Sequence, residues 1–371
     1  MAAALALAKR NLPSTVLEQA PQFREAGAGI QFCPNTFKIL HHLGMTEAFT
    51  QIANFPEFLC YVDGLTDFEF VRLPLGEKIV DRFDHPFGSF HREEVLREFV
   101  KACQASPLIT LVTSAKVIAV EEQNNGVVAI TEQGERYLGQ ILIGCDGIGS
   151  IVRKFVCGTT KPRDSGQIIY RGVVHRKDMP TDLALENIVH YVRPNGHVVH
   201  YPIGRNDYFN ISAIFQTASP NDSQNLEDWF AGSIPKVIEL IRKVDPAMRW
   251  SLCDRDPISV WYKGRIVLLG DAIHPTLPYL TSGAGMAVED AVVLAKKIAL
   301  HGDNYVQAFE EYQKERYLRT AYVQLFSRAY GDVHHSSGVG RELRNHLISK
   351  RTVEDNYNWV SYLYGGINLE D

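Results

Sequence analysis

GDAIHPTLPYLTSGAGMAVEDA, residues 270–291, is the stretch of sequence that decides the fold. It follows the apolar run RIVLL, which is typical of a buried strand, and leads into GMAVEDAVVLAKKIAL, whose apolar residues recur at helical spacing. Ligands of α/β sheets bind at the carboxyl ends of strands, so Asp271 is predicted to face a ligand. Gly283 and Ala284 bring bare backbone amides to the helix start, which suits electron-rich oxygen atoms. On spacing alone, a plain turn with Asp271 as a helix cap is an equally good interpretation.

The other segments predict an α/β unit and a second, largely antiparallel unit. MAAALALAKRN is rich in helix formers, and STVLEQ suits a short buried strand that ends at Glu18. REEVLREFVKACQ gives one apolar helical face, and strand-like runs separated by turns follow it up to residue 147. From residue 167 to residue 215 the pattern is again β, with Asn195-Gly196 as a hairpin signal. A long helix is expected from about residue 305 to residue 335.

Composition indicates a globular chain and excludes several classes of partner. The 371 residues exceed the size at which one core keeps growing, so at least two packed units are expected. The net charge of -5 and the lack of any Lys/Arg block argue against nucleic acid. No segment approaches the roughly 20 apolar residues of a membrane span. The 6 cysteines show no spacing typical of metal ligands, so we expect no metal and a reducing, cytoplasmic location.

Several segments together resemble the flavin-dependent aromatic hydroxylases. GDAIHP and GAGMAVEDA are similar to the family's second FAD-binding motif, and ILIGCDGIGSIVRK (residues 141–154) is similar to its Asp-Gly motif. VLEQAPQFREAGAGIQFCPN, FHREEVL and CDRDP match further segments in the right order. The likeness runs from Met1 nearly to the C-terminus and is greatest for the salicylate hydroxylase and 3-hydroxybenzoate 6-hydroxylase branch.

This resemblance implies a doubly wound, Rossmann-like α/β FAD-binding domain with an inserted β-rich substrate domain and C-terminal helices. The FAD-binding domain would comprise residues 1–60, 86–165 and 263–371, and the substrate domain residues 61–85 and 166–262. The implied enzyme is a monooxygenase that binds FAD, takes electrons from NAD(P)H, and uses dioxygen to hydroxylate a phenol or aromatic acid. A flavin oxidase or dehydrogenase on the same scaffold is an alternative.

The resemblance also implies which residues bind the cofactor. Glu18 would bind the adenosine ribose, and Arg92 the ribityl or phosphate region. The remaining implied contacts are Ala28 and Gly29 beside the flavin, Asp146 near the pyrophosphate, Asp271 at the ribityl chain, Gly283 and Ala284 at the flavin edge, and Arg153 in support of the nicotinamide. A solvated strand-end carboxylate is the alternative for Glu18, and a surface arginine is the alternative for Arg92.

Three further residues match positions that line the substrate pocket in the family: Arg171, Tyr201 and His197. A phenol must lose its proton to become a strong nucleophile, so a cation, a hydroxyl or an imidazole should lie beside it. His197 and Tyr201 are four residues apart on one predicted strand, so they share a face and could share a pocket. The alternatives are an ion-pair role for Arg171, core packing for Tyr201 and a hairpin surface position for His197.

Two departures from the family pattern affect these expectations. Family members begin with a strand and a GxGxxG loop that holds the FAD diphosphate, whereas Met1 here already lies inside the expected first helix. We therefore expect a shortened chain that retains little FAD, and the alternative function is that of a non-catalytic paralogue with a binding role. Pro278 stands where the closest hydroxylases often carry Gln, so the sequence leaves the substrate and its regiochemistry open. It also does not decide between NADH and NADPH or define the oligomeric state.

Overall fold

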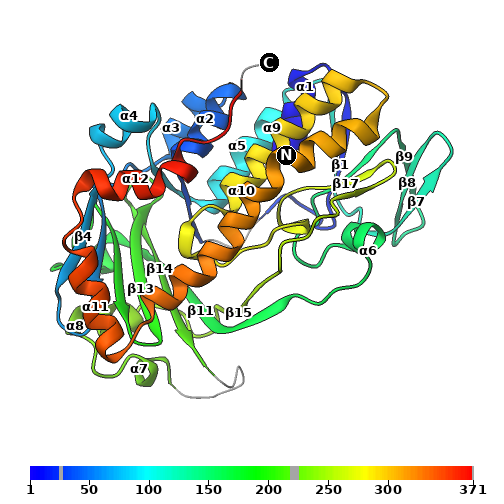
Figure 1. The fold of residues 1–371 in the computed structure, drawn as a ribbon. Coiled ribbons are helices and arrows are strands. Elements are labelled where there is room, and N and C mark those ends of the chain that lie inside the picture. The colour runs from blue at the N-terminus through cyan, green and yellow to red at the C-terminus, as the bar shows by residue number, and fades with distance from the viewer. Residues whose placement is uncertain (25–27, 218–224, 370–371) are drawn as a thin grey trace.

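A seven-stranded sheet forms the larger β unit of the computed structural model, which describes residues 1–24, 28–217 and 225–369 (Figure 1). Its strand order is β15-β11-β14-β13-β12-β3-β4, and all neighbours are antiparallel except β12 and β3. The strands are β3 (Phe58–Asp63), β4 (Glu69–Pro74), β11 (Arg163–His175), β12 (Ile188–Arg193), β13 (Gly196–Ile203), β14 (Tyr208–Gln216) and β15 (Arg249–Asp254). The predicted antiparallel unit is confirmed, whereas its domain boundaries at residues 61 and 166 stay a prediction.

The predicted hairpin between β12 and β13 is confirmed, but its turn lies one residue earlier than expected. Arg193 pairs with Gly196, so Pro194 and Asn195 form the turn, and only Asn195 has a positive φ, of 60°. Gly196 is already part of β13, where a methyl group would stand 2.7 Å from the Ile214 carbonyl oxygen. Close strand approach, and not turn geometry, therefore requires glycine at this position.

The α/β unit contains two short parallel strand pairs. β1 (Ser14–Leu17) pairs with β6 (Ile109–Val112), and β10 (Leu142–Gly144) pairs with β17 (Ile266–Leu268), whose other neighbour is the antiparallel β16 (Tyr262–Lys263). Two accessory sheets are added by β2 (Gly29–Phe32) with β5 (Gly88–His91), and by β7 (Val117–Gln123), β8 (Gly126–Thr131) and β9 (Arg136–Gly139). Strands alternating with helices confirm the expected Rossmann-like unit with an inserted sheet.

Helices cover the α/β unit and join it to the large sheet (Figure 1). α10 (Tyr305–His334) confirms the predicted long helix, and its 30 residues span about 45 Å. α11 (Gly338–Ile348) and α12 (Val353–Tyr364) then pack on β4. The other helices are α1 (Ala2–Lys9), α2 (Pro34–His42), α3 (Thr46–Ile52), α4 (Glu77–Phe83), α5 (Arg92–Gln104), α6 (Ile151–Cys157), α7 (Leu226–Trp229), α8 (Pro235–Ile241) and α9 (Gly283–His301).

Two adjacent carboxylates on α9, Glu289 and Asp290, are fully buried. Asp290 accepts a hydrogen bond from Arg316 Nε at 2.7 Å, lies 2.6 Å from His274 Nε2, and accepts the Gly270 N–H at 3.2 Å. Burial by itself would raise the pKa of Asp290, but His274 and Arg316 outweigh it and lower the pKa to about 2. Asp290 therefore connects the turn after β17 to α9 and α10.

Glu289 makes the second half of this network. It accepts both ends of the Arg319 fork at 2.7 and 2.8 Å, and Asn35 Nδ2 at 2.8 Å. Arg319 also donates to the Leu363 carbonyl at 2.7 Å. Burial acts to raise the pKa of Glu289, but Arg316 and Arg319 hold it below its usual range. Glu289 therefore connects α9 to α2, α10 and the end of α12.

We expect Asp290→Asn to lower the free energy of unfolding by about 3 to 5 kcal/mol at neutral pH, because it removes one of the two buried carboxylates that neutralise the Arg316 and Arg319 charges. Urea unfolding measures the change. Glu310→Gln removes an exposed carboxylate from α10 and should change stability by less than about 0.5 kcal/mol. Equal stability of Asp290→Asn and the wild-type protein would contradict this account of the network.

The pH dependence of the same variant gives an independent check. Because the pKa of Asp290 is lowered, its stabilising effect is complete above the ordinary value of 3.8 and is lost as pH falls through about 2. The difference in stability between wild type and Asp290→Asn should therefore shrink as pH falls over this range.

Candidate active site

One face of the seven-stranded sheet carries the residues that the sequence singled out. Paired residues on neighbouring strands point to the same side, so the registers place one row of side chains across this face: Tyr61, His190, Val199, Ser212 and Arg171. His197 and Tyr201 flank Val199 at a spacing of two residues and therefore share its face, as the alternation predicted. Val199 and Tyr201 pack with Leu280 and with Met286 of α9, so this face is directed toward the segment around the start of α9.

Tyr201 lies against the beginning of β2. A methyl group on Gly29 would stand 2.5 Å from Tyr201 Oη, and the Gly29 N–H donates to Asn210 Oδ1 at 2.8 Å. Burial raises the pKa of Tyr201 to about 12, against the opposing effect of the Arg171 and Arg92 charges. Tyr201 therefore contacts Gly29 and lies within the electrostatic range of Arg171 and Arg92. Gly29 and Arg92 are two of the residues expected to contact the cofactor.

His197 belongs to a different cluster. Its Nδ1 lies 2.9 Å from His335 Nε2, and its ring centroid is 5.6 Å from that of Tyr279 and 5.9 Å from that of His190. Only 3% of His197 is exposed, so a surface position on the hairpin is wrong. Burial lowers the pKa of His197 well below its usual value, and the nearby imidazoles of His335, His190 and His334 add to this effect. His197 is therefore a neutral imidazole near neutral pH.

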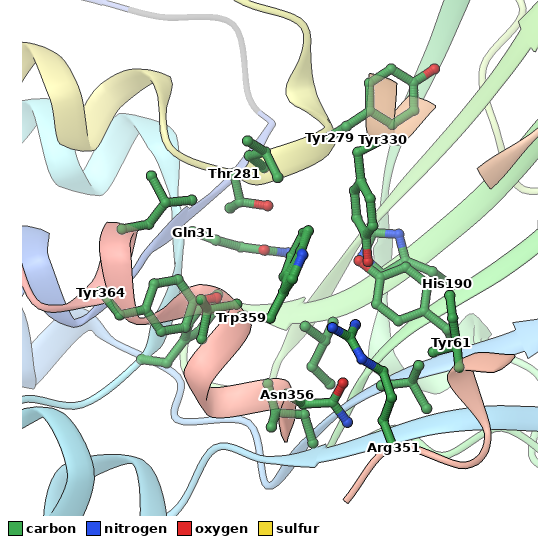
Figure 2. A pocket seen from close by; sticks show the side chains of 18 residues that line it. Gln31, Tyr61, His190, Tyr279, Thr281, Tyr330, Arg351, Asn356, Trp359 and Tyr364 are labelled. Carbon is green, nitrogen blue, oxygen red and sulfur yellow. The ribbon is translucent and has the colours of Figure 1, made fainter. Parts of the chain in front are cut away.

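A cavity of about 60 Å³ opens on the same face (Figure 2). Its first wall is the sheet, which contributes Tyr61 and His190 among apolar residues. Its second wall is the segment before α9, with Tyr279, Leu280 and Thr281. The C-terminal helices and their connections provide the third wall, which includes Tyr330, Arg351, Asn356 and Trp359. Arg171, Tyr201 and His197 do not line this space, although His197 contacts the two wall residues His190 and Tyr279.

The segment from β17 to α9 presents polar groups of the expected kinds. Asp271 is exposed in the turn that directly follows β17. Gly283 and Ala284 start α9, and the first N–H groups of a helix have no intrahelical acceptor. Ser282 donates its hydroxyl to the Leu280 carbonyl at 2.7 Å and does not cap the helix. Backbone N–H donors therefore stand at this helix start, where an oxygen-bearing ligand edge would be bound.

Arg153 has a different role from the expected one. It is 3% exposed, and its guanidinium donates to the carbonyls of Ala272 and Ile273 at 2.9 and 3.0 Å. Contact with a nicotinamide cofactor does not fit this inward orientation. Arg153 instead braces the turn that carries Asp271.

The other proposed cofactor residues lie at strand ends and helix starts. Glu18 follows β1 and accepts the Ala20 N–H at 2.8 Å. Arg92 is the first residue of α5, and its N–H donates to the carbonyl of the buried Ala28 at 2.9 Å. Asp146 accepts the N–H groups of Ile151 at 2.7 Å and of Val152 at 3.1 Å, so its carboxylate caps α6.

These residues fit FAD in the chemistry of their donors and acceptors. Glu18 and Asp271 can accept hydrogen bonds from sugar and ribityl hydroxyls. The N–H groups at the start of α9 can donate to an electron-rich ring edge. Gly29 is packed closely against Tyr201 and Asn210, where a methyl group would not fit, so glycine is required at this position.

Comparison with known proteins agrees with this site. Residues 1–327 match the FAD binding domain family. The 3-hydroxybenzoate 6-hydroxylase of Polaromonas naphthalenivorans is 36% identical to the chain, over 98% of this chain and 93% of that protein. The crystal structure of Klebsiella pneumoniae HpxO complexed with FAD and uric acid has a TM-score of 0.86 and 26% identity, and the match covers 98% of this chain and 94% of that one. A salicylate hydroxylase substrate complex shares the fold, with a TM-score of 0.80 and 23% identity over 97% of this chain and 92% of that one.

The chain therefore belongs to the FAD binding domain family and, within it, to the flavin-dependent aromatic hydroxylases. In residues 1–24, 28–217 and 225–369, no group of three or more His, Cys, Asp or Glu side chains is arranged to hold a metal ion. Within the described part of the chain, no helix is long and apolar enough to cross a membrane.

Sequence reasoning missed Asn210, Arg351 and Trp359. Asn210 and Ser212 are polar residues within the apolar run FNISAIF, a signal that could have marked one face of β14 as functional. The aromatic-rich tail NYNWVSYLYGG contains Trp359 and was the available signal for a C-terminal wall. No local pattern indicated Arg351.

We expect Gly29→Ala to weaken flavin retention and to destabilise the protein by about 1 to 3 kcal/mol, because the new methyl group would overlap Tyr201 and Asn210. Flavin content after purification and thermal unfolding measure the two effects. Gly340→Ala on α11 is a matched control, because a methyl group there would meet only Ser336 Cβ, at 3.7 Å. That control should be neutral or slightly stabilising, and a Gly29→Ala protein that behaves in the same way would refute the close approach.

Proposed function

We propose that the protein is an FAD-dependent monooxygenase that hydroxylates an aromatic acid bearing a ring hydroxyl. One oxygen atom of dioxygen enters the ring, the other leaves as water, and NAD(P)H supplies the two electrons. The observation that carries this proposal is the cavity between the sheet face and Thr281, because its aromatic and polar lining lies next to the segment proposed to hold the flavin. At about 60 Å³ this space has to widen to admit an aromatic acid. When bound, FAD accepts electrons from NAD(P)H and passes them to dioxygen.

The proposed cofactor contacts are those of the sequence analysis. Glu18 binds the ribose, and Ala28 and Gly29 approach the flavin side. Arg92 contacts the ribityl or phosphate region, and Asp146, which caps α6, braces the pyrophosphate region. Asp271 binds the ribityl chain, and the N–H groups of Gly283 and Ala284 bind the ring edge. The 6 free cysteines support the further proposal that the enzyme works in the cytoplasm.

The three proposed functional residues act on the phenol from behind the lining of the cavity. Arg171 and Tyr201 position the phenol by the charge and the hydroxyl that they place on the same sheet face, and His197 takes up the phenolic proton through His190 and Tyr279, the lining residues that it contacts. His335 Nε2 lies 2.9 Å from His197 Nδ1, so the accepted charge can be shared with a second imidazole although burial lowers the pKa of both rings. Apolar walls such as Leu59, Leu73 and Leu363 exclude water from the bound ring.

Isotope labelling tests the proposed reaction. The flavin-loaded protein is supplied with 3-hydroxybenzoate, NADH or NADPH, and ¹⁸O₂, and the mass of the product is measured. The proposal predicts a hydroxylated product that carries one ¹⁸O atom. NAD(P)H oxidation that never places ¹⁸O in an aromatic product, across a panel of hydroxybenzoates, would identify a flavin oxidase instead.

A binding role without catalysis is the second candidate. The observation that favours it is the division of the parallel strands into two separate sheets, β1 with β6 and β10 with β17, instead of one continuous sheet. A discontinuous sheet gives the diphosphate of FAD less support than a continuous one. Purified protein without flavin absorbance, and without gain of flavin on reconstitution, would favour this role over the enzyme.

Asp271→Ala should weaken FAD binding by about 1.5 to 3 kcal/mol, roughly ten- to hundredfold, since it removes a charged hydrogen-bond acceptor. Titration of the apoprotein with FAD measures the dissociation constant. Asp332→Ala removes an exposed carboxylate on α10 and should leave the constant unchanged. If Asp271→Ala binds FAD as tightly as wild type, the ribityl contact is refuted.

Tyr201→Phe and Arg171→Ala should slow hydroxylation at least about tenfold in the flavin-loaded protein, because both residues are proposed to position the phenol from the sheet face. They should change the rate of flavin reduction measured without substrate far less. Tyr208→Phe, at an exposed tyrosine of β14, is the control and should alter neither rate. Unchanged hydroxylation would remove the substituted residue from the mechanism.

A further inference from the structure

The cavity is lined by one charged side chain among the described residues, that of Arg351. Tyrosine, histidine, glutamine, threonine and asparagine side chains provide the remaining polar groups, and the other lining residues are apolar or aromatic. An anionic ligand that entered such a space without a cation would lose hydration without compensation. Arg351 therefore decides which charge the cavity accepts.

Arg351 is held at the mouth of the cavity. It lies in the short connection between α11 and α12, where its N–H donates to the Ile348 carbonyl at 3.0 Å. Its guanidinium lies 5.9 Å from the centre of the Trp359 ring, which also lines the cavity. The residue is exposed, so the guanidinium can meet a ligand that arrives from solvent. Figure 2 shows Arg351 and Asn356 together at the end of the cavity away from Thr281.

Hydrogen bonds from Thr352 lower the pKa of the nearby Asp355 carboxylate, and the Arg351 charge adds to this effect. Asp355 Oδ2 accepts the N–H and the hydroxyl of Thr352, both at 2.8 Å, in the capping box that starts α12. Burial raises the pKa of Tyr330, and the Arg351 charge is one of the effects that oppose this rise. The guanidinium fork thus remains available to a carboxylate, whose two oxygen atoms match its geometry.

We propose that Arg351, assisted by the Asn356 amide, binds the carboxylate of the aromatic substrate and so selects acids over neutral phenols. The ring then lies among Tyr330, Trp359 and Tyr61, with its far edge toward Thr281 and the start of α9. This inference rests on the proposed function, because it assigns the substrate's carboxylate to one end of the same cavity.

The test compares an acid with its neutral counterpart in flavin-loaded protein. Calorimetry gives the dissociation constants of 3-hydroxybenzoate and 3-hydroxybenzamide, and steady-state kinetics gives KM and kcat for both. Arg351→Met should weaken binding of the acid and raise its KM about ten- to hundredfold, with the amide changed less than about twofold. Arg351→Lys should fall between wild type and Arg351→Met, because it keeps the charge and loses the fork.

Lys350→Met is the matched control. It removes a positive charge from the neighbouring position, which does not line the cavity, and should leave both ligands unaffected. Equal weakening of acid and amide by Arg351→Met would overturn the proposal in favour of a packing role. An effect of Lys350→Met as large as that of Arg351→Met would overturn the proposal in favour of a non-specific electrostatic attraction by positive surface charges.

Binding and turnover separate this inference from the proposed function. If the acid binds through Arg351 and no hydroxylated product forms, the carboxylate site is supported and the monooxygenase proposal fails. If the wild-type protein hydroxylates the acid and Arg351→Met retains wild-type affinity for it, the carboxylate site is overturned and the proposed function stands. A flavin-loaded wild-type protein that binds neither ligand overturns both.

Discussion

The buried pair of carboxylates on α9 is the constraint on which the site depends. Two negative charges side by side in the core are tolerated because Arg316 and Arg319 of α10 neutralise them. The same contacts fix the turn after β17, through Gly270 and His274, and the end of α12, through Leu363. The segment that carries the proposed flavin contacts is thus attached to the helices that close the cavity.

The cavity follows from this attachment. α10 extends from the α/β unit to the large sheet, and α11 and α12 return along β4 (Figure 1). Tyr279, just before α9, donates to Gln167 of β11 at 2.6 Å and packs against Gly331 of α10, where a methyl group would stand 2.7 Å from its ring. Tyr279 therefore contacts both the sheet and α10. The sheet, the segment before α9 and the C-terminal helices, which are far apart in the sequence, together enclose the cavity.

Local sequence patterns predicted the features that depend only on residues close together in the sequence. The strand-to-helix motif around Asp271, the hairpin at Asn195, the extent of α10 and the shared face of His197 and Tyr201 all follow from periodicity and turn chemistry. Local patterns did not reveal that Arg153 braces the turn after β17, because its carbonyl partners come from a loop over a hundred residues later. The C-terminal wall, with Arg351, depends on how α11 and α12 return to the sheet, which no local pattern specifies.

The central claim is that a ring in the cavity lies beside the flavin at the start of α9. Titration of the flavin-loaded protein with 3-hydroxybenzoate, followed by the visible absorbance of the flavin, tests this most directly. The account predicts a saturable change in the flavin spectrum, because the bound ring alters the surroundings of the isoalloxazine. Tight binding of the acid, measured independently, without any change in the flavin spectrum would contradict the account.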